Sequence, residues 1–301
     1  MHPRSLRFLR ILPVAALAAT IVGSARAQIT HLEAVAINGA AETPPVVTPA
    51  TGAGDVTVNT AAHVVKHHMT FSGLTSAQTL AHIHGPAAVG VPGPIMFSIP
   101  LGSPSNGSSA SSAGNEADIL AGNSYFNVHT QNNPGGEIRG QLVPAPAIGS
   151  AFCLGDGTAG PCPCANNGAP GHGCENSSTT GGALLSASGH NSPDNVVLIV
   201  SQTKPVALCV FFTGSTIVGP FLYGDGQRCV GSTKRLGSKN ATGGAAAYPE
   251  AAELSITARS AALGVPISPG QHRFYFVAYR DPTAFCTANT FNASNAVDIL
   301  W

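Results

Sequence analysis

The segment that decides the fold class is Tyr125-Phe-Asn-Val-His-Thr-Gln-Asn-Asn-Pro-Gly-Gly-Glu-Ile-Arg-Gly-Gln-Leu142. Residues 125–130 and 137–143 both alternate with a period of two, which is typical of half-buried strands. Between them, Asn133-Pro-Gly-Gly136 consists of residues that favour a tight turn. The segment therefore predicts two strands joined by a hairpin corner.

The same alternation occurs in four earlier segments, residues 55–59, 64–71, 80–84 and 95–99, each bounded by Gly, Pro, Asn or Ser. Residues 102–114 are rich in Ser, Gly and Asn and predict a loop, followed by a short helical turn around residues 115–121. Only 9% of the residues are charged, and the many Gly, Pro, Ser, Thr and Val residues suit short strands and turns. We therefore predict an all-β fold, an antiparallel β-sandwich or Greek-key barrel.

The N-terminal residues predict export. Arginines at positions 4, 7 and 10 precede an apolar stretch over residues 11–22, and Ala25-Arg-Ala27 supplies the small residues that signal peptidase recognises. Residues 1–27 are therefore predicted to be a signal peptide that is cleaved before Gln28. No later segment is long and apolar enough for a membrane helix. We expect a secreted protein, extracellular, periplasmic or on the cell surface, with no transmembrane segment after cleavage.

The charge of the chain argues against nucleic acid as a partner. The chain has 14 basic and 14 acidic residues, and four arginines lie in the predicted signal peptide, so ten basic residues remain against 14 acidic ones, a net charge of −4. A basic face for nucleic acid is therefore not expected. The sequence also lacks a Gly-x-Ser-x-Gly elbow, a His-Glu-x-x-His helix, a Walker loop and a dinucleotide fingerprint in its strand-turn-helix context. A common hydrolase or nucleotide-dependent enzyme is thus disfavoured.

Two motifs resemble a known family. Ala81-His-Ile-His-Gly-Pro-Ala87 and the segment quoted first together are similar to the signature of the CHRD domain, a module named for the repeats of chordin and similar to domains in many secreted bacterial proteins. The resemblance covers roughly residues 29–143. It implies an exported β module of a family without an established reaction, and hence an unknown extracellular or cell-surface ligand as partner.

The second half of the chain contains all seven cysteines, at positions 153, 162, 164, 174, 209, 229 and 286. In an exported chain, cysteines form disulfides far more often than thiolate metal sites. Cys209 lies in an apolar run, residues 206–212, and is predicted to be the unpaired one, because a buried cysteine behaves as a small hydrophobe. Cys162 and Cys164 are expected to have different partners. Six cysteines allow fifteen pairings, and the sequence does not choose among them.

The composition changes at Val143-Pro-Ala-Pro-Ala-Ile-Gly-Ser150, where two prolines favour an extended connection. We predict a signal peptide over residues 1–27, a CHRD-like β domain over residues 28–143, a proline-containing linker over residues 144–150, and a second, disulfide-containing β-rich domain over residues 151–301. The cysteine-rich stretch from Phe152 to Ser177 and the ending from Phe291 to Trp301 resemble a module of secreted planctomycete proteins that has no assigned reaction.

His82, His84 and His129 are candidate metal ligands. Residues two apart on a strand project from the same face, so His82 and His84 would point together. His129 lies on another predicted strand, on the face opposite Phe126 and Val128, and would converge with the pair if the two strands are neighbours. Three neutral imidazoles suit copper or zinc.

A structural role for these histidines stays open, because a histidine at a strand end often bonds only to turn carbonyls, here at the Gly85-Pro86 corner. His63, His67 and His68 are weaker candidates as ligands. Glu137 is expected to form a fixed ion pair with charges such as Arg139, or to cap a loop, and not to be catalytic. The sequence therefore favours an exported, non-enzymatic binding or cell-surface structural protein. The alternative is a histidine-ligated copper or zinc protein that could be redox-active.

Overall fold

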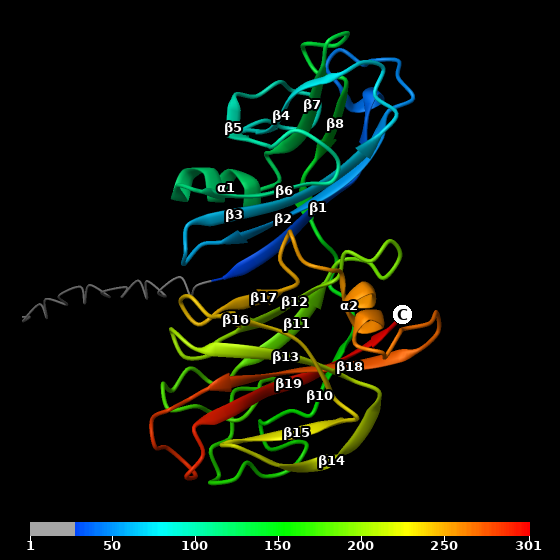
Figure 1. Cartoon of the computed structure of the whole chain (residues 1–301). Helices are drawn as coiled ribbons and strands as arrows, with labels where there is room; N and C mark the ends of the chain where they lie inside the picture. The colour runs from blue at the N-terminus through cyan, green and yellow to red at the C-terminus, as the bar shows by residue number, and fades with distance from the viewer. Residues whose placement is uncertain (1–27) are drawn as a thin grey trace, which may run out of the picture.

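The computed structural model describes residues 28–301, so the predicted signal peptide lies outside the described residues. Strands make up most of its regular structure. Figure 1 shows two parts, one above the other: the N-terminal half (residues 28–144), drawn from blue to green, and the C-terminal half (residues 145–301), drawn from green to red. Within residues 28–301, no helix has the length and apolar character needed to cross a membrane.

One antiparallel sheet of nine strands forms the N-terminal half and curls into a nearly closed barrel. Its strands are β1 (Ile29–Asn38), β2 (Thr51–Asn59), β3 (Val64–Ser72), β4 (Gln78–His84), β5 (Ile95–Ser98), β6 (Ser105–Ala110), β7 (Tyr125–Thr130), β8 (Ile138–Gln141) and β9 (Val143–Pro144). Their order is β5-β4-β7-β8-β1-β2-β3-β6, and β9 pairs with β1. Two short helices, η1 (Gly39–Ala41) and α1 (Ala113–Leu120), complete this half.

Alternation along β4 and β7 separates a core face from a polar face. Ile83, Phe126 and Val128 are fully buried and belong to one apolar cluster inside the sheet. Successive side chains of a strand point to opposite faces. The histidines next to these core residues, His82, His84 and His129, therefore project away from the cluster.

Two strands of this half were not predicted. β1 lies inside the sheet and is buried continuously from His31 to Ala34. In its sequence, the apolar run from Ala34 to Ile37 interrupts the alternation of polar and apolar residues. β6 falls inside the predicted loop over residues 102–114, which was therefore wrong in part. This edge strand pairs with β3 through its backbone, and its small polar side chains carry no apolar signal. The predicted helical turn is present as α1.

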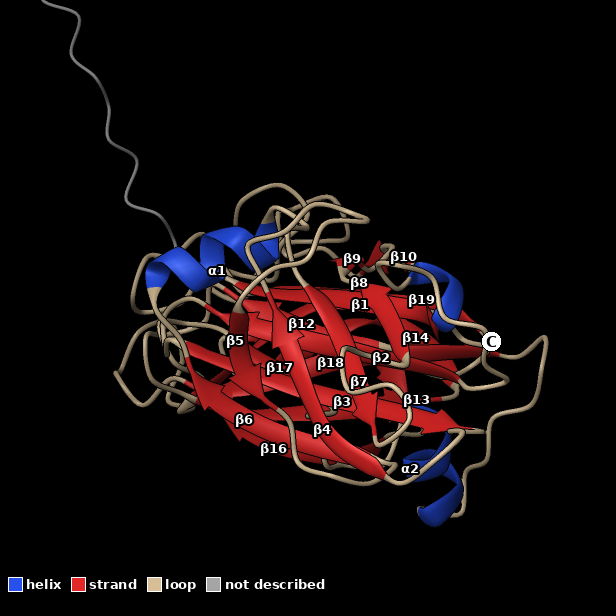
Figure 2. Cartoon of the chain, turned by 90° about the horizontal axis from the view of Figure 1, so that it is seen from above, coloured by secondary structure: helices blue, strands red, loops and turns tan. Residues whose placement is uncertain are grey.

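The C-terminal half contains three antiparallel sheets, of order β10-β19-β18-β13-β16, β11-β12-β17 and β14-β15. The strands are β10 (Ser150–Phe152), β11 (Leu184–Ser188), β12 (Val197–Ser201), β13 (Leu208–Gly214), β14 (Thr216–Tyr223), β15 (Gly226–Gly231), β16 (Lys234–Asn240), β17 (Ala246–Tyr248), β18 (His272–Arg280) and β19 (Phe291–Leu300). The helix α2 (Ile256–Ala262) separates β17 from β18. Figure 2 shows from above how strands of both halves are stacked and how loops and helices gather at the ends. The predicted all-β class, with disulfides in the second part, is confirmed.

Three disulfides join six of the seven cysteines: Cys153–Cys229, Cys162–Cys174 and Cys164–Cys286. Cys209 is the one free cysteine of the described chain and is fully buried on β13. Both cysteine predictions, an unpaired Cys209 and different partners for Cys162 and Cys164, are therefore confirmed.

The two halves touch through charged and polar side chains. The carboxylate of Glu33 on β1 accepts hydrogen bonds from Nε2 of His190 (2.9 Å) and Nδ2 of Asn195 (2.8 Å) in the C-terminal half. Lys66 on β3 lies 2.5 Å from the carboxylate of Glu250. Beside these contacts, Ile29 packs into a small apolar cluster with residues of β12 and β17.

Candidate metal centre

Strands β4 and β7 bring three histidines together. The two strands are antiparallel neighbours, and their register pairs His82 with Asn127, His84 with Tyr125, and Leu80 with His129. His82 and His84 therefore share the polar face of the sheet with His129 on the adjacent strand. The three imidazoles converge, which is the arrangement that the sequence predicts when these strands are neighbours.

The spacing of the ring nitrogens suits a single ion. Each histidine offers one nitrogen, and the three atoms all lie within 4.8 Å of one another. Nδ1 of His82 is 3.2 Å from Nε2 of His129. Two nitrogens that bind the same tetrahedral zinc ion, each at about 2.0–2.1 Å, lie about 3.3 Å from each other. Among residues 28–301, no other group of three or more His, Cys, Asp or Glu side chains has such spacing.

Backbone carbonyls orient two of the rings. Nδ1 of His84 donates to the carbonyl of Gly93 (2.9 Å), and Nδ1 of His129 donates to the carbonyl of Pro134 (3.0 Å). Because a carbonyl oxygen only accepts, each neutral ring carries its proton on Nδ1 and keeps a lone pair on Nε2. Metal-binding histidines are commonly fixed in this way by a carbonyl bound to the other ring nitrogen.

Nε2 of His84 lacks a partner. It is buried and makes no hydrogen bond with any described residue. An unsatisfied buried acceptor costs about 1–3 kcal/mol. A metal ion shared with His82 and His129 would satisfy this lone pair.

Burial favours the neutral form of all three rings. It is the largest cause that lowers the pKa of His82, His84 and His129 below the ordinary value of 6.5. The neighbouring imidazoles lower the pKa of His82 further, and the charge of Arg139 does so for His84. The hydrogen bonds to Gly93 and Pro134 act in the opposite sense but are weaker than burial. Neutral imidazole is the form that binds a metal.

Tyr125 and Arg139 form a stack beside His84. The Tyr125 ring lies parallel to the His84 ring, within 7°, with the centroids 5.1 Å apart. The guanidinium carbon of Arg139 is 3.5 Å from the centre of the Tyr125 ring. The Tyr125 hydroxyl accepts a hydrogen bond from the Gly93 amide, and Nη2 of Arg139 donates to the Ala88 carbonyl. The loop over residues 85–94 is thereby held across this face of the sheet.

Glu42 joins the same face, and no sequence signal pointed to it. Its carboxylate accepts a hydrogen bond from Nδ2 of Asn127 at 2.7 Å. Burial raises the pKa of Glu42 to about 7, although the Asn127 hydrogen bond and the charge of Arg139 act to lower it. Glu42 is 85 residues from Asn127 in the chain, and only the tertiary fold brings the two together.

The weaker candidates do not join the three histidines. Nδ1 of His63 bonds to Glu116 (3.0 Å), and Nδ1 of His68 lies 3.4 Å from Asp55. His67 is buried on β3 against Gly107.

Glu137 caps loops, which is one of the two roles predicted for it. Its carboxylate accepts hydrogen bonds from the hydroxyls of Thr48 and Thr130 (2.6 Å each) and from the amide and hydroxyl of Thr75 (2.8 and 3.0 Å). Burial alone would raise the pKa of Glu137, but these hydrogen bonds outweigh it and lower the pKa to about 2. No ion pair with Arg139 accompanies them among the described residues.

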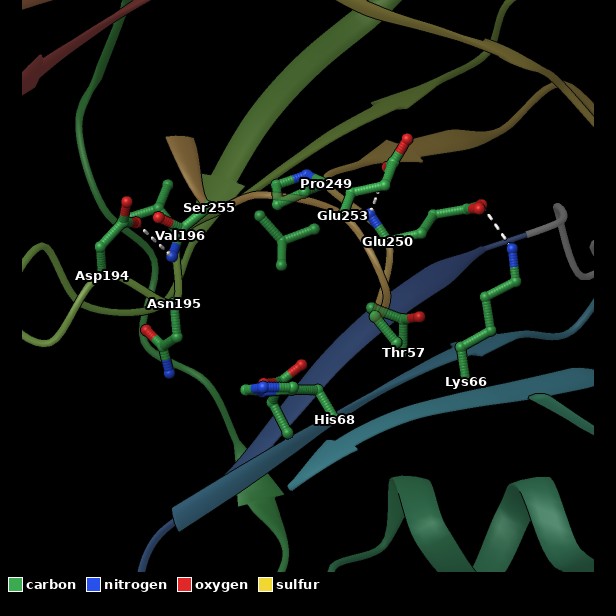
Figure 3. Close-up of a pocket in the computed structure, with 13 residues that line it drawn as sticks. Thr57, Lys66, His68, Asp194, Asn195, Val196, Pro249, Glu250, Glu253 and Ser255 are labelled. Carbon is green, nitrogen blue, oxygen red and sulfur yellow. Dashed lines mark hydrogen bonds and ion pairs between the residues drawn. The ribbon is translucent and has the colours of Figure 1, made fainter. Parts of the chain in front are cut away.

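A separate pocket lies between the two halves (Figure 3). Thr57, Lys66 and His68 line it from β2 and β3, and Asp194 and Glu250 line it from the C-terminal half. Its charged groups already have partners: Lys66 pairs with Glu250, and the Asp194 carboxylate accepts from the amide and hydroxyl of Thr257. This pocket contains none of the three clustered histidines, so we place the candidate site on β4 and β7.

Residues 34–142 match the family model described as the CHRD domain. The matched residues include the three histidines, Glu42 and Asn127, and most of the nine-stranded sheet. Neither the curated proteins nor the solved structures contain a match to this chain.

Proposed function

We propose that this protein is an exported, non-enzymatic binding protein whose CHRD domain holds one zinc or copper ion on His82, His84 and His129. The observation that carries the proposal is the buried Nε2 atom of His84, which has no hydrogen-bond partner although the ring is fixed by its other nitrogen. The His129 ring is likewise fixed through Nδ1, which leaves a lone pair on its Nε2. Nδ1 of His82 lies 3.2 Å from this Nε2, a distance expected for two ligands of the same ion.

A purely structural role for the histidines accounts for less of the geometry. In that reading, Nδ1 of His82 would donate to Nε2 of His129, and the two backbone carbonyls would hold the other rings. The lone pair of His84 would still be buried without a donor. A shared ion satisfies all three nitrogens, so it is the better explanation.

Export is supported by the N-terminal sequence and by the three disulfides, which form and persist in oxidising compartments. We further propose that residues 151–301 belong to the module of secreted planctomycete proteins that they resemble. A mature protein recovered from an exporting host should begin at Gln28, which N-terminal sequencing would establish.

The metal site is tested with the full mature chain, purified without a histidine tag. We expect elemental analysis to find about one zinc or copper ion per chain, and calorimetric titration of the metal-free protein to give saturable binding at neutral pH. His82→Ala, His84→Ala and His129→Ala should each abolish this binding. His68→Ala is the matched control, because His68 is a half-exposed histidine of the same sheet that lies outside the cluster. Equal binding by the wild type and all three variants would overturn the proposal.

A further inference from the structure

Asn127 lies beside the histidine cluster with an unused oxygen. It is opposite His82 in the register of β4 and β7, on the same face of the sheet, and only 3% of it is exposed. Its Nδ2 donates to Glu42, whereas its Oδ1 is buried and has no hydrogen-bond partner among the described residues. A buried amide oxygen needs a donor, and none is supplied by the protein here.

Glu42 and a glycine fix the position of this amide. Glu42 is 8% exposed and follows η1 directly. A Cβ atom at position 136 would lie 2.6 Å from Oε1 of Glu42 and 2.8 Å from Oδ1 of Asn127. Gly136 therefore lets the turn between β7 and β8 close directly over the pair. The same turn supplies the Pro134 carbonyl that orients His129.

Three imidazoles leave a tetrahedral ion with one open position, which water fills when no other ligand is present. A metal-bound water is a strong hydrogen-bond donor, and side chains that bond to it control its orientation and acidity. We propose that the water in this position donates to Oδ1 of Asn127, and that Glu42 is a positioning residue that holds the Asn127 amide in the required orientation. This inference rests on the proposed metal site.

Cobalt provides the test, because the visible spectrum of Co²⁺ reports on its ligands and on the ionisation of a bound water. The full mature chain is loaded with Co²⁺, and its affinity and the pH midpoint of its spectrum are measured for the wild type, Asn127→Ala and Glu42→Gln. We expect Asn127→Ala to bind cobalt about 10–100-fold more weakly than the wild type. Glu42→Gln should weaken binding less, because the Gln oxygen can still accept from Nδ2 of Asn127. The Gln amide can also donate, however, so it no longer fixes the orientation of the Asn127 amide. We also expect the pH midpoint to move, and to move downward in Glu42→Gln, because a nearby negative charge that opposes hydroxide is removed.

The double variant Glu42→Gln/Asn127→Asp is the rescue. It keeps one negative charge and one hydrogen bond in the pair with the donor and acceptor exchanged, and leaves an acceptor oxygen for the water. We expect it to recover most of the lost affinity. Glu116→Gln is the matched control, since Glu116 is equally buried but bonds to Ser111 and His63 away from the site.

The outcomes separate the two proposals. If the wild type binds cobalt, and Asn127→Ala and Glu42→Gln match it in affinity and pH midpoint, the inference is wrong and the metal site stands. If the wild type binds neither cobalt nor zinc nor copper, both are wrong. Should Asn127→Ala fail to fold by circular dichroism, Glu42→Gln decides alone, because it exchanges a single atom of the carboxylate.

Discussion

The hydroxyl of Thr130 donates a 2.6 Å hydrogen bond to the carboxylate of Glu137 across the turn that joins β7 and β8. Thr48 and Thr75 bring hydrogen bonds to the same carboxylate from two other connections of the N-terminal half. One fully buried carboxylate therefore ties together three loops, next to the strand that carries His129.

Glu137→Gln should destabilise the protein in a pH-dependent way. The pKa of Glu137 is about 2 in the folded protein, compared with an ordinary value of 4.5. A lowered pKa contributes stability that is complete above about pH 4.5 and is lost as the pH falls through about 2. At pH 7 we expect the free energy of unfolding to drop by about 1–3 kcal/mol, as for a buried charged group that loses its hydrogen bonds. Urea unfolding at pH 7 and pH 2.5 measures this, and an equal loss at both values would contradict it. Asp118→Asn is the control, because Asp118 on α1 is half-buried and makes no side-chain hydrogen bond or ion pair with the described residues.

Zinc binding should persist to lower pH than free histidine would allow. Because burial lowers the pKa of His82, His84 and His129 below 6.5, protons compete with the metal only below that value. We expect the affinity to be nearly constant from about pH 8 to about pH 6.5 and to fall at lower pH. Without metal, the same shift makes the unfolded state bind more protons below pH 6.5, so the folded state should lose stability there. Calorimetric titrations at three pH values check the first part, and a decline that begins above pH 7 would count against it.

Alkylation should identify one free cysteine that reacts slowly in the native protein. Burial raises the pKa of Cys209 to about 12, so the native protein should react with an alkylating reagent only slowly. In denaturant without reductant, we expect about one thiol per chain, mapped to Cys209 by peptide analysis. With reductant, all seven should react. A label at Cys229 or Cys286 in the unreduced protein would mean that the disulfide pairing is different.

A chain that ends after Pro144 should fold alone. The apolar cluster of the N-terminal half draws only on residues 32–142, and ending after Pro144 preserves the pairing of β9 with β1. Ile29 and Glu33 would lose their contacts with the C-terminal half, which costs some stability. We expect a β-type circular dichroism spectrum, a cooperative thermal transition and retained zinc binding. An unfolded product would refute the proposed division into two domains.

The sequence predicted those strands whose apolar and polar residues alternate, including β7, whose six residues are all buried. Alternation located β4 and β7, and with them the shared face of His82, His84 and His129. It failed for β1, where the apolar run from Ala34 to Ile37 interrupts the alternation, and for β6, whose small polar residues pair only through the backbone. The role of Glu42 could not be predicted, since its contact with Asn127, 85 residues away in the chain, depends on how a loop crosses the folded sheet. The cysteine partners were likewise set by tertiary structure, whereas the apolar run around Cys209 was enough to identify the unpaired residue.

The cysteines and the imidazole cluster of this chain lie in different halves. All seven cysteines follow residue 150, and the three clustered histidines precede it. Free thiolates bind zinc and copper tightly, so reduced cysteines compete with histidines for a metal that is present during folding. Here the proposed ion site contains no cysteine, so formation of the disulfides removes none of its ligands. Once the three disulfides have formed, the one thiol left in residues 28–301 is the buried Cys209, so thiols no longer compete with the histidines for an ion.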